Sequence, residues 1–230
     1  MRKIIILCTI LAIAGMQGAS AQNLQLHYKT GQWLYPDSLG SDARIMSTAE
    51  MFHVDAWGDT FFFIDMTYTP QGVNYAYWEI ARNLRFWDVP LALHLEYNGG
   101  LLGRILFNNA YMAGVSYALA SKDGTKNISV ALMYKYIQGL SQPSNYQFTT
   151  VWNMDFAGGK CTFAGFLDFW RQSGTFILLS QPQFWVNLNA FNGVNDNFGL
   201  SLGTEIELSS NLFYRGFYIV PTIAAKWTFR

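Results

Sequence analysis

Apolar and polar residues alternate through most of the chain after residue 21. In the last segment every second residue from 217 to 229 is apolar, and the segment 23–29 sets Leu24 against Gln25 in the same way. Successive side chains of a strand point to opposite faces, so this period of two predicts strands with one apolar and one polar face. We expect about twelve strands, near residues 23–29, 45–55, 59–68, 73–86, 91–98, 107–119, 127–136, 146–156, 162–170, 181–189, 198–208 and 217–229.

The interleaved apolar residues do not fit membrane-spanning helices. After the first residues no stretch approaches the eighteen or so consecutive apolar residues that such a helix needs. The chain is nevertheless 17% aromatic and only 13% charged, about half of the usual charged fraction. In a closed β-barrel, lipid-facing and lumen-facing side chains alternate along each strand. We therefore predict an all-β fold: a closed antiparallel transmembrane β-barrel of about 12 strands, formed by a single domain over residues 22–230.

Residues 1–21 have the features of a secretory signal peptide. A basic start is followed by an apolar run from 4 to 13 and by small residues at 19–21, and no lipoprotein cleavage context is present. Removal of this segment leaves Cys161 as the one cysteine, so no intramolecular disulfide is expected. The sequence thus predicts an exported protein without a lipid anchor, placed in the outer membrane of a Gram-negative bacterium.

The segments between the strands predict the orientation of the barrel. With a periplasmic N-terminus the longest loop, 32–44, faces outward, and the periplasmic connections are mostly short. Asn98-Gly99-Gly100 predicts a turn at the end of the strand 91–98. Arg82 falls on the apolar side of its strand, which predicts a bulge or an interfacial position there. The faces of the strand 45–55 are left unassigned because its residues alternate poorly.

The hairpin around residues 55–79 offers the main indication of function. One face of its first strand carries Asp59, Phe61, Phe63 and Asp65, an unusual mixture of carboxylates and large rings. A face of this kind suggests a wet cavity with aromatic walls. Nucleic-acid bases stack on aromatic side chains with about 1–3 kcal/mol each, and the hydroxyl groups of a ribose donate to carboxylates.

Polar-face residues of the other strands extend this candidate lumen. We expect the lumen to bind a small solute through Asp59, Phe61, Phe63, Asp65, Tyr75, Tyr77, Glu79, His94, Glu96, Asp168, Trp170, Gln183, Trp185 and Glu205. Two alternatives stay open. The rings fill a narrow barrel without binding anything, or the inward carboxylates pair with Arg85, Lys135 and Lys226 as a structural ladder. The carboxylates of such a ladder are Glu79, Glu96, Asp168, Glu205 and Glu207.

Charge and composition exclude several function classes. Lys plus Arg equals Asp plus Glu at 15 each, which leaves no basic surplus for a nucleic-acid polymer. His27, His53 and His94 lie on different predicted strands without metal-site spacing, and no glycine-rich phosphate loop is present. We expect no catalytic residues, no metal and no cofactor, and a monomer in contact with membrane lipid.

A family resemblance is carried by short motifs spread over most of the chain. They are Trp57-Gly-Asp-Thr-Phe-Phe-Phe-Ile-Asp65, Glu79, Trp152, Gly165-Phe-Leu-Asp168, Gln181-Pro-Gln183, Gly203-Thr-Glu205 and Lys226-Trp-Thr-Phe229. With them the sequence resembles the Tsx-like family of nucleoside-specific outer-membrane channels, in particular a shorter branch related to it. The resemblance implies a twelve-stranded barrel with a narrow lumen through which nucleosides diffuse past weak sites.

Two departures from that family concern charge and the chain end. The family tends to carry a proline and a differently placed arginine around residues 82–85, and Arg230 follows the terminal aromatic Phe229 here. Our hypothesis is an outer-membrane channel for nucleosides or similar small solutes. The alternatives are a closed structural or surface-binding barrel and, less favoured, an outer-membrane enzyme.

Overall fold

The computed structural model describes residues 21–36, 44–103 and 105–229. All of the predicted signal peptide except Ala21 lies outside this range. The strands are β1 (Ala21–Lys29), β2 (Ile45–Asp55), β3 (Gly58–Thr69), β4 (Gly72–Leu84), β5 (Leu91–Leu102), β6 (Ile105–Leu106), β7 (Ala110–Ala120), β8 (Lys126–Ile137), β9 (Ser144–Phe156), β10 (Cys161–Gln172), β11 (Thr175–Ser180), β12 (Gln183–Asn187), β13 (Leu200–Ser210) and β14 (Phe217–Phe229). Two short helices, α2 (Gly31–Leu34) and η1 (Leu188–Ala190), complete the described elements.

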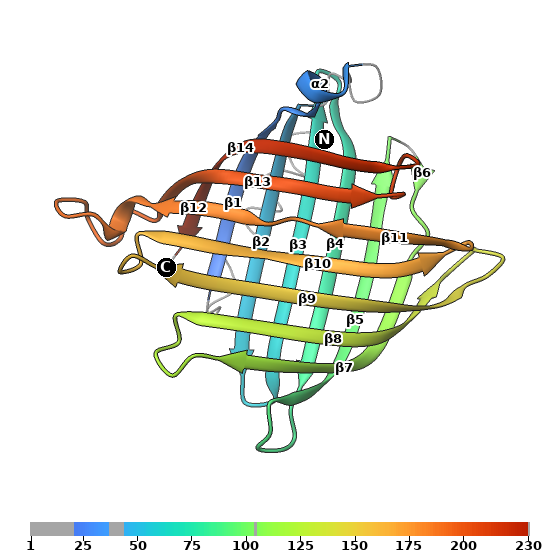
Figure 1. Ribbon diagram of the computed structural model, residues 1–230, viewed down its shortest axis with the longest axis horizontal. Coiled ribbons are helices and arrows are strands. Elements are labelled where there is room, and N and C mark those ends of the chain that lie inside the picture. The colour runs from blue at the N-terminus through green and yellow to red at the C-terminus, as the bar shows by residue number, and fades with distance from the viewer. Residues whose placement is uncertain (1–20, 37–43, 104, 230) are drawn as a thin grey trace.

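Antiparallel pairing runs around the whole sheet and closes it into a barrel of 12 strand positions, as predicted. The ring closes where β14 pairs with β1, with Lys226 opposite Gln25 and Ala224 opposite His27. In Figure 1, β7 to β10 cross in front of β1 to β5, so the two walls of the barrel are seen one behind the other. Closure leaves no unpaired sheet edge, which a barrel in lipid requires.

Two of the strands, β11 and β12, together occupy one position in the ring. Both pair with β10 in a single register, with Ser180 opposite Leu167 and Gln183 opposite Ala164. The break between them falls at Pro182, which has no backbone N–H to donate to the ladder. The short β6 pairs only with the end of β5 and adds no position to the ring.

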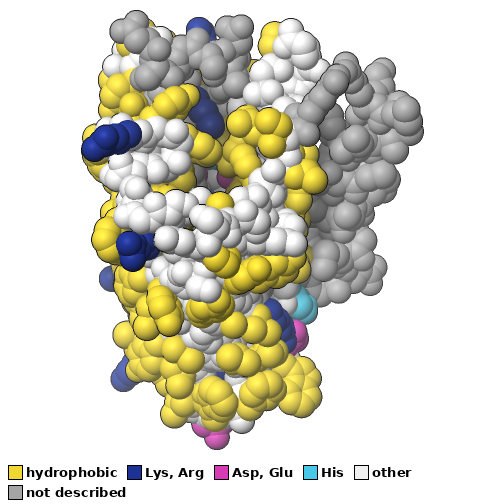
Figure 2. Space-filling view, turned by 90° about the vertical axis from the view of Figure 1, so that its right-hand side faces the viewer, with side chains coloured by type: hydrophobic (Ala, Val, Ile, Leu, Met, Phe, Trp, Pro, Cys, Tyr) yellow, Lys and Arg dark blue, Asp and Glu magenta, His cyan; other side chains and the backbone are white. Residues whose placement is uncertain are grey.

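The two faces of the strands are in different surroundings. On β5, Leu93 and Leu95 on the outer face are about two-fifths exposed, whereas His94 and Glu96 on the inner face are buried. Figure 2 shows hydrophobic side chains gathered over the lower part of one outer face. The predicted parity of the strands is therefore confirmed, and an apolar outer band of this kind suits lipid.

Register also assigns the faces of β2, which the sequence left open. Thr48 lies opposite Gln25, and Glu50 lies opposite Asn23. Because directly opposed residues of neighbouring strands point to the same side, Thr48 and Glu50 face inward.

The bulge that the sequence allowed at Arg82 is absent. It lies on the outer face of β4, one position from the inward Asn83, and the pairing of β3 with β4 is regular around it. Its guanidinium nitrogen lies 2.8 Å from Oδ2 of Asp55, at the end of β2. The same nitrogen donates to Thr60 Oγ1 at 2.9 Å. A charged partner at the barrel end, rather than a bulge, accommodates this arginine.

Two sequence predictions about strand limits are wrong. The expected turn at Asn98-Gly99-Gly100 is absent, because β5 continues to Leu102. A Cβ atom on Gly100 would lie 2.4 Å from the ring of Phe107, so the glycine makes room for an aromatic side chain and not for a turn. Phe107 itself lies before β7, which begins at Ala110, although it was expected to start that strand.

The strand β11 was missed by the sequence pattern. Its inward residues Ile177 and Leu179, which lie opposite Trp170 and Asp168, are as apolar as its outward ones. A strand with two apolar faces has no period of two to detect. The strand predicted over residues 181–189 ends earlier than expected, because residues 188–190 form the short helix η1 instead of extended chain.

Both described ends of the chain, Ala21 and Phe229, lie at one end of the barrel. The connections at this end are 56–57, 85–90, 121–125, 157–160 and 188–199, and those at the opposite end are 30–44, 70–71, 103–109, 138–143, 173–174 and 211–216. The first loop is the longest, as predicted, although residues 37–43 lie outside the described range. The difference in length between the two ends is smaller than expected, because 188–199 is long and 70–71 and 173–174 are tight turns. Among the described residues no helix is long and apolar enough to cross a membrane.

Candidate functional site: the barrel interior

Every residue predicted to line the lumen faces the barrel interior. The cross-strand register places them there, with Phe63 opposite Glu79, Asp168 opposite Thr149, and Gln183 opposite Glu205. Both faces of the hairpin 55–79 are thus as the sequence predicted. Whether these side chains bind a solute is a separate matter and stays a prediction.

Three rings form a continuous aromatic surface on β3 and β4. The ring centroids of Phe61 and Phe63 are 5.7 Å apart, and those of Phe63 and Tyr77 are also 5.7 Å apart. The hydroxyl of Tyr77 donates to Oε2 of Glu79 at 3.4 Å. Rings and a carboxylate therefore meet on one wall, and we call Phe61, Phe63 and Tyr77 the aromatic wall.

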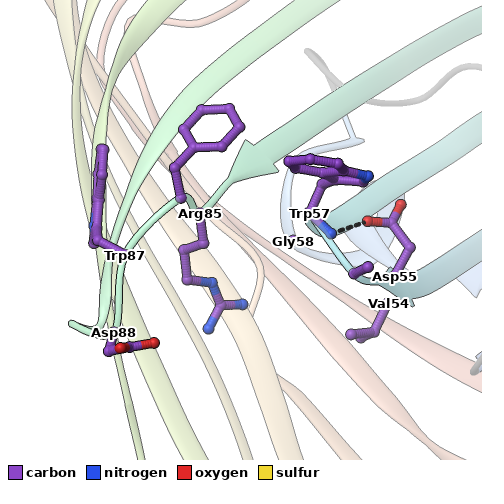
Figure 3. A pocket seen from close by; sticks show the side chains of 9 residues that line it. Val54, Asp55, Trp57, Gly58, Arg85, Trp87 and Asp88 are labelled. Atoms are coloured by element: carbon purple, nitrogen blue, oxygen red, sulfur yellow. Dashed lines mark hydrogen bonds between the residues drawn. The ribbon is translucent and has the colours of Figure 1, made fainter.

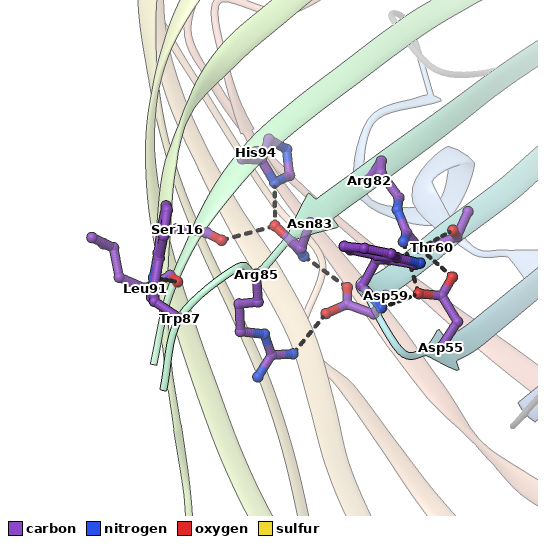
Figure 4. A network of polar contacts seen from close by, with 11 residues as sticks. Asp55, Asp59, Thr60, Arg82, Asn83, Arg85, Trp87, Leu91, His94 and Ser116 are labelled. Carbon is purple, nitrogen blue, oxygen red and sulfur yellow. Dashed lines mark hydrogen bonds and ion pairs between the residues drawn. The ribbon is translucent and has the colours of Figure 1, made fainter. Parts of the chain in front are cut away.

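Asp59 belongs to a polar network near the end of the barrel at which the termini lie (Figure 4). Its carboxylate accepts from Asn83 at 2.8 Å and from Arg85 at 3.2 Å. Asn83 Oδ1 lies 2.9 Å from Nδ1 of His94, whose Nε2 lies 2.9 Å from Oε2 of Glu96. Asp59 thus pairs with Arg85, although the ladder considered from the sequence placed other carboxylates beside this arginine. His94 positions one oxygen of Glu96.

Two lysines of the lumen lie over tryptophan rings. Lys135 Nζ is 4.3 Å from the ring centroid of Trp170, and Lys226 Nζ is 4.5 Å from that of Trp185. Lys135 also donates to Oε1 of Gln147 at 2.6 Å. Within the described chain neither lysine lies within ion-pair distance of a carboxylate. A cation over a desolvated aromatic ring is attracted by the quadrupole of that ring. Both ammonium groups therefore have a favourable contact without a salt bridge.

Three of the inward carboxylates, those of Asp65, Asp168 and Glu205, accept from neutral donors on the next strand. Thr48 donates to Asp65, Thr149 donates to Asp168, and Gln183 Nε2 donates to Glu205 Oε2 at 2.7 Å. Among the residues that the structure describes, none of these three carboxylates forms an ion pair. The alternative of a ladder with Lys135 and Lys226 is therefore not observed for these three, and lumen carboxylates remain without a bound cation.

Carboxylates outnumber ammonium groups on the inner face. By register the inward carboxylates are Glu50, Asp59, Asp65, Glu79, Glu96, Asp155, Asp168, Glu205 and Glu207, and the inward lysines are Lys29, Lys135 and Lys226. The site residues predicted from the sequence did not include Glu50, because its strand alternates poorly. They also did not include the three lysines, because alternation places these side chains inward but does not show what they contact. The interior is thus acidic although the whole chain has no net charge.

One part of the inner face is open to solvent. Val151 of β9 lies between the inward residues Thr149 and Asn153 and opposite Phe166, so register places it in the lumen. Its side chain is nevertheless 44% exposed. An exposed apolar residue inside a barrel indicates space beside it, so this wall of the lumen is not filled by side chains.

Rings from the loops gather at the barrel end opposite the termini. Tyr75 of β4 lies 5.6 Å from Phe107 and 6.2 Å from Phe213, measured between ring centroids. Tyr35, just after α2, lies 5.1 Å from Tyr218 of β14. Tyr75 was predicted from the alternation of its strand, whereas Phe107 and Phe213 belong to connections, where alternation gives no information. We call Tyr75, Phe107 and Phe213 the loop-end aromatic group.

The other end of the barrel has a shallow hollow of about 500 Å³ (Figure 3). It lies between the turn after β2 and the turn after β4, and the side chains of Trp57, Arg85 and Trp87 border it. Trp57 and Trp87 are 62% and 45% exposed. Exposed tryptophans at a barrel end fit the headgroup level of a bilayer, so we assign them to membrane anchoring.

Among the described residues, no group of three or more His, Cys, Asp and Glu side chains is arranged to hold a metal ion. His27 is held between Gln25 Oε1 at 3.0 Å and Thr222 Oγ1 at 3.1 Å, as an ordinary buried histidine would be.

The family of the chain follows from a match over nearly its whole length. The model of a family described as a domain of unknown function, DUF5020, matches residues 21–229. The chain belongs to this family. No curated protein matches the sequence.

Two solved porin structures are similar to the barrel. The KdgM porin has a TM-score of 0.54 and 10% identity, and the match covers 91% of this chain and 99% of that chain. The NanC porin, in a rhombohedral crystal form, has a TM-score of 0.56 and 9% identity, with coverage of 90% and 99%. At such low identities the likeness concerns the fold alone. Neither comparison shows the Tsx-like family, so that resemblance stays a prediction.

Proposed function

We propose that the protein is an outer-membrane channel of a Gram-negative bacterium through which nucleosides or similar small solutes diffuse. The observation that carries the proposal is the aromatic wall beside Glu79, together with the solvent-exposed Val151 inside the barrel. The apolar outer face, the likeness to two porins and the predicted signal peptide support the membrane and the compartment.

Nucleosides fit the wall because they need two kinds of contact at once. A neutral base stacks on rings such as Phe61 and Phe63, and the ribose hydroxyls donate to an acceptor such as Asp65 or Glu79. Stacking of about 1–3 kcal/mol per base gives weak binding, which suits passage through a channel because the solute must also leave. The resemblance to Tsx-like channels points to the same class of solute.

Conductance of single channels in planar bilayers tests this proposal. We expect a stable conductance that adenosine reduces in a concentration-dependent way and that ribose alone reduces much less. Adenine, which stacks but has no ribose, should block more weakly than adenosine. A conductance that none of the three changes would leave a channel without nucleoside specificity.

The loop-end aromatic group favours a second candidate, a closed barrel without transport. Tyr75, Phe107 and Phe213 lie together at one mouth, and rings at a mouth obstruct passage. In that case the purified protein inserts into bilayers and gives no conductance. Turnover of lipid or peptide by the same preparation would instead indicate the enzyme class, for which we propose no catalytic residues.

A further inference from the structure

We propose that the lumen binds the ammonium group of organic cations at the inward side chains Glu79, Glu96, Asn98 and Asp168, here called the acidic cluster, which has Lys135 beside it. A channel with such a site prefers cations and disfavours anions. Binding of the cation is independent of the proposed function, whereas its passage rests on it.

Two neighbouring strands supply most of the cluster. Glu79 of β4 lies directly opposite Asn98 of β5, and Glu96 is the next inward residue along β5. Side chains at such positions are separated by about 5–8 Å between Cβ atoms, within reach of one ligand. This part of the cluster is therefore set by strand pairing and not by flexible loops.

Asp168 and Lys135 come to the cluster from other strands, β10 and β8. Lys135 lies in the cross-strand row of Glu96, because Met112 of β7 is opposite both residues. Hydrogen bonds through Gln147 and Thr149 connect Lys135 to Asp168. Three carboxylates are thus grouped with one ammonium group, which already contacts Trp170 and Gln147.

Unpartnered oxygens give an independent indication of a ligand. Glu96 Oε1 and Asn98 Oδ1 are buried and have no hydrogen-bond partner among the described residues. Glu96 is 9% exposed and Asn98 is 6% exposed. A buried acceptor without a donor costs free energy, more so on a charged group, so these two oxygens favour a ligand that brings N–H groups to them.

An ammonium group meets these requirements better than other ligands. It brings three donors and a positive charge into a site that has unpartnered acceptors and excess negative charge. A neutral hydroxyl brings a donor without charge, and an anion is repelled. A chelated metal ion is not favoured, since the described chain has no suitable group of ligands.

The probe for this proposal is spermidine in planar bilayers, with KCl as the electrolyte. A tenfold KCl gradient should give a reversal potential of the sign of a cation-preferring pore, and spermidine should block the current. Glu96→Gln should weaken the block about tenfold, the loss of one charge-assisted hydrogen bond. An anion-preferring reversal potential, or an undiminished block in Glu96→Gln, would overturn the proposal.

A matched control separates the cluster from general lumen charge. Glu207→Gln removes the same charge from the inner face of β13, outside the acidic cluster, and should change the spermidine block less than about twofold. Lys135→Gln removes the competing cation and should strengthen the block. Equal effects of Glu96→Gln and Glu207→Gln would mean that only summed charge acts and that no site exists.

Binding of spermidine can also be measured without conduction. The binding site and the proposed channel are therefore tested separately. In detergent, spermidine should raise the unfolding temperature of the unaltered protein and not that of Glu96→Gln. If the protein conducts nothing, the proposed channel fails and this measurement still decides on the site. If it conducts and spermidine gives neither block nor a shift in the unfolding temperature, the site fails and the channel remains.

Discussion

Lys135 lies over the ring of Trp170, with its ammonium nitrogen 4.3 Å from the ring centroid, and not beside a carboxylate. This pair joins β8 to β10, which are not neighbours in the ring, since β9 lies between them. The contact between Lys135 and Trp170 passes over the lumen side of β9. It therefore connects β8 to β10 through side chains, in addition to the hydrogen bonds between the backbones of neighbouring strands.

The free energy of this contact is measurable with a double-mutant cycle. Lys135→Met and Trp170→Leu, alone and combined, should give a coupling free energy of about 0.5–2 kcal/mol in urea unfolding from lipid vesicles. The control pair is Lys135→Met with Trp185→Leu, whose ring lies under Lys226 instead. Coupling of equal size in both pairs would contradict a specific cation–ring contact.

A charged side chain on the outer face should lower the free energy of unfolding much more than one on the inner face. Two residues of similar exposure test this prediction. Val115, in the middle of β7 on the outer face, is 49% exposed, and Val151 on the inner face is 44% exposed. Val115→Arg should lower the free energy of unfolding by about 2–4 kcal/mol, because the guanidinium is placed in lipid far from both barrel ends. Val151→Arg, in the open part of the lumen, should cost much less. Similar costs in vesicles would show that the inner and outer faces are misassigned.

The aromatic wall predicts opposite changes in two properties of the channel. Replacing Phe61 and Phe63 together with alanine should widen the path and remove stacking, so that ion conductance rises while adenosine block weakens at least tenfold, about 1.4 kcal/mol. Phe62→Ala, on the outer face between them, is the control and should change neither. If conductance rises and there was no adenosine block to lose, the rings only fill space.

The loop-end aromatic group predicts a gain of conductance at small structural cost. Phe213 belongs to the connection between β13 and β14 and is 58% exposed. Phe213→Ala should raise the single-channel conductance and change the free energy of unfolding by less than about 1 kcal/mol, as for other exposed positions. Unchanged conductance would mean that the ring stands clear of the path.

Alternation alone predicted the barrel and the face of each site residue. On β5 the pattern is strong because His94 and Glu96 face the lumen and Leu93 and Leu95 face lipid, two surroundings that select opposite side chains. Where both faces are apolar, as at Ile177 in β11, the signal disappears and the strand was missed. Strand faces follow from sequence only where the two surroundings differ.

Contacts between side chains of strands that are not neighbours could not be predicted from the sequence. That Lys135 meets Trp170 depends on how the strands are staggered around the barrel, and Phe107 reaches Tyr75 only because Gly100 leaves space for its ring. Pairing of the lysines with carboxylates was one of the alternatives that the sequence left open, since opposite charges favour it. Tryptophan rings lie within reach of Lys135 and Lys226. The positions of the side chains decide whether a ring or a carboxylate contacts each ammonium group.

The seam between β1 and β14 has a consequence for how the protein folds. His27 and Thr222 form a hydrogen bond across a separation of 195 residues. Contacts so distant in the chain cost the largest loop-closure entropy and slow the folding of a β-protein. Until β14 pairs with β1, the two outer strands of the sheet expose unpaired N–H and C=O groups, which invite pairing with other chains. A chain shortened by its final strand keeps these edges open and should aggregate instead of closing into a barrel.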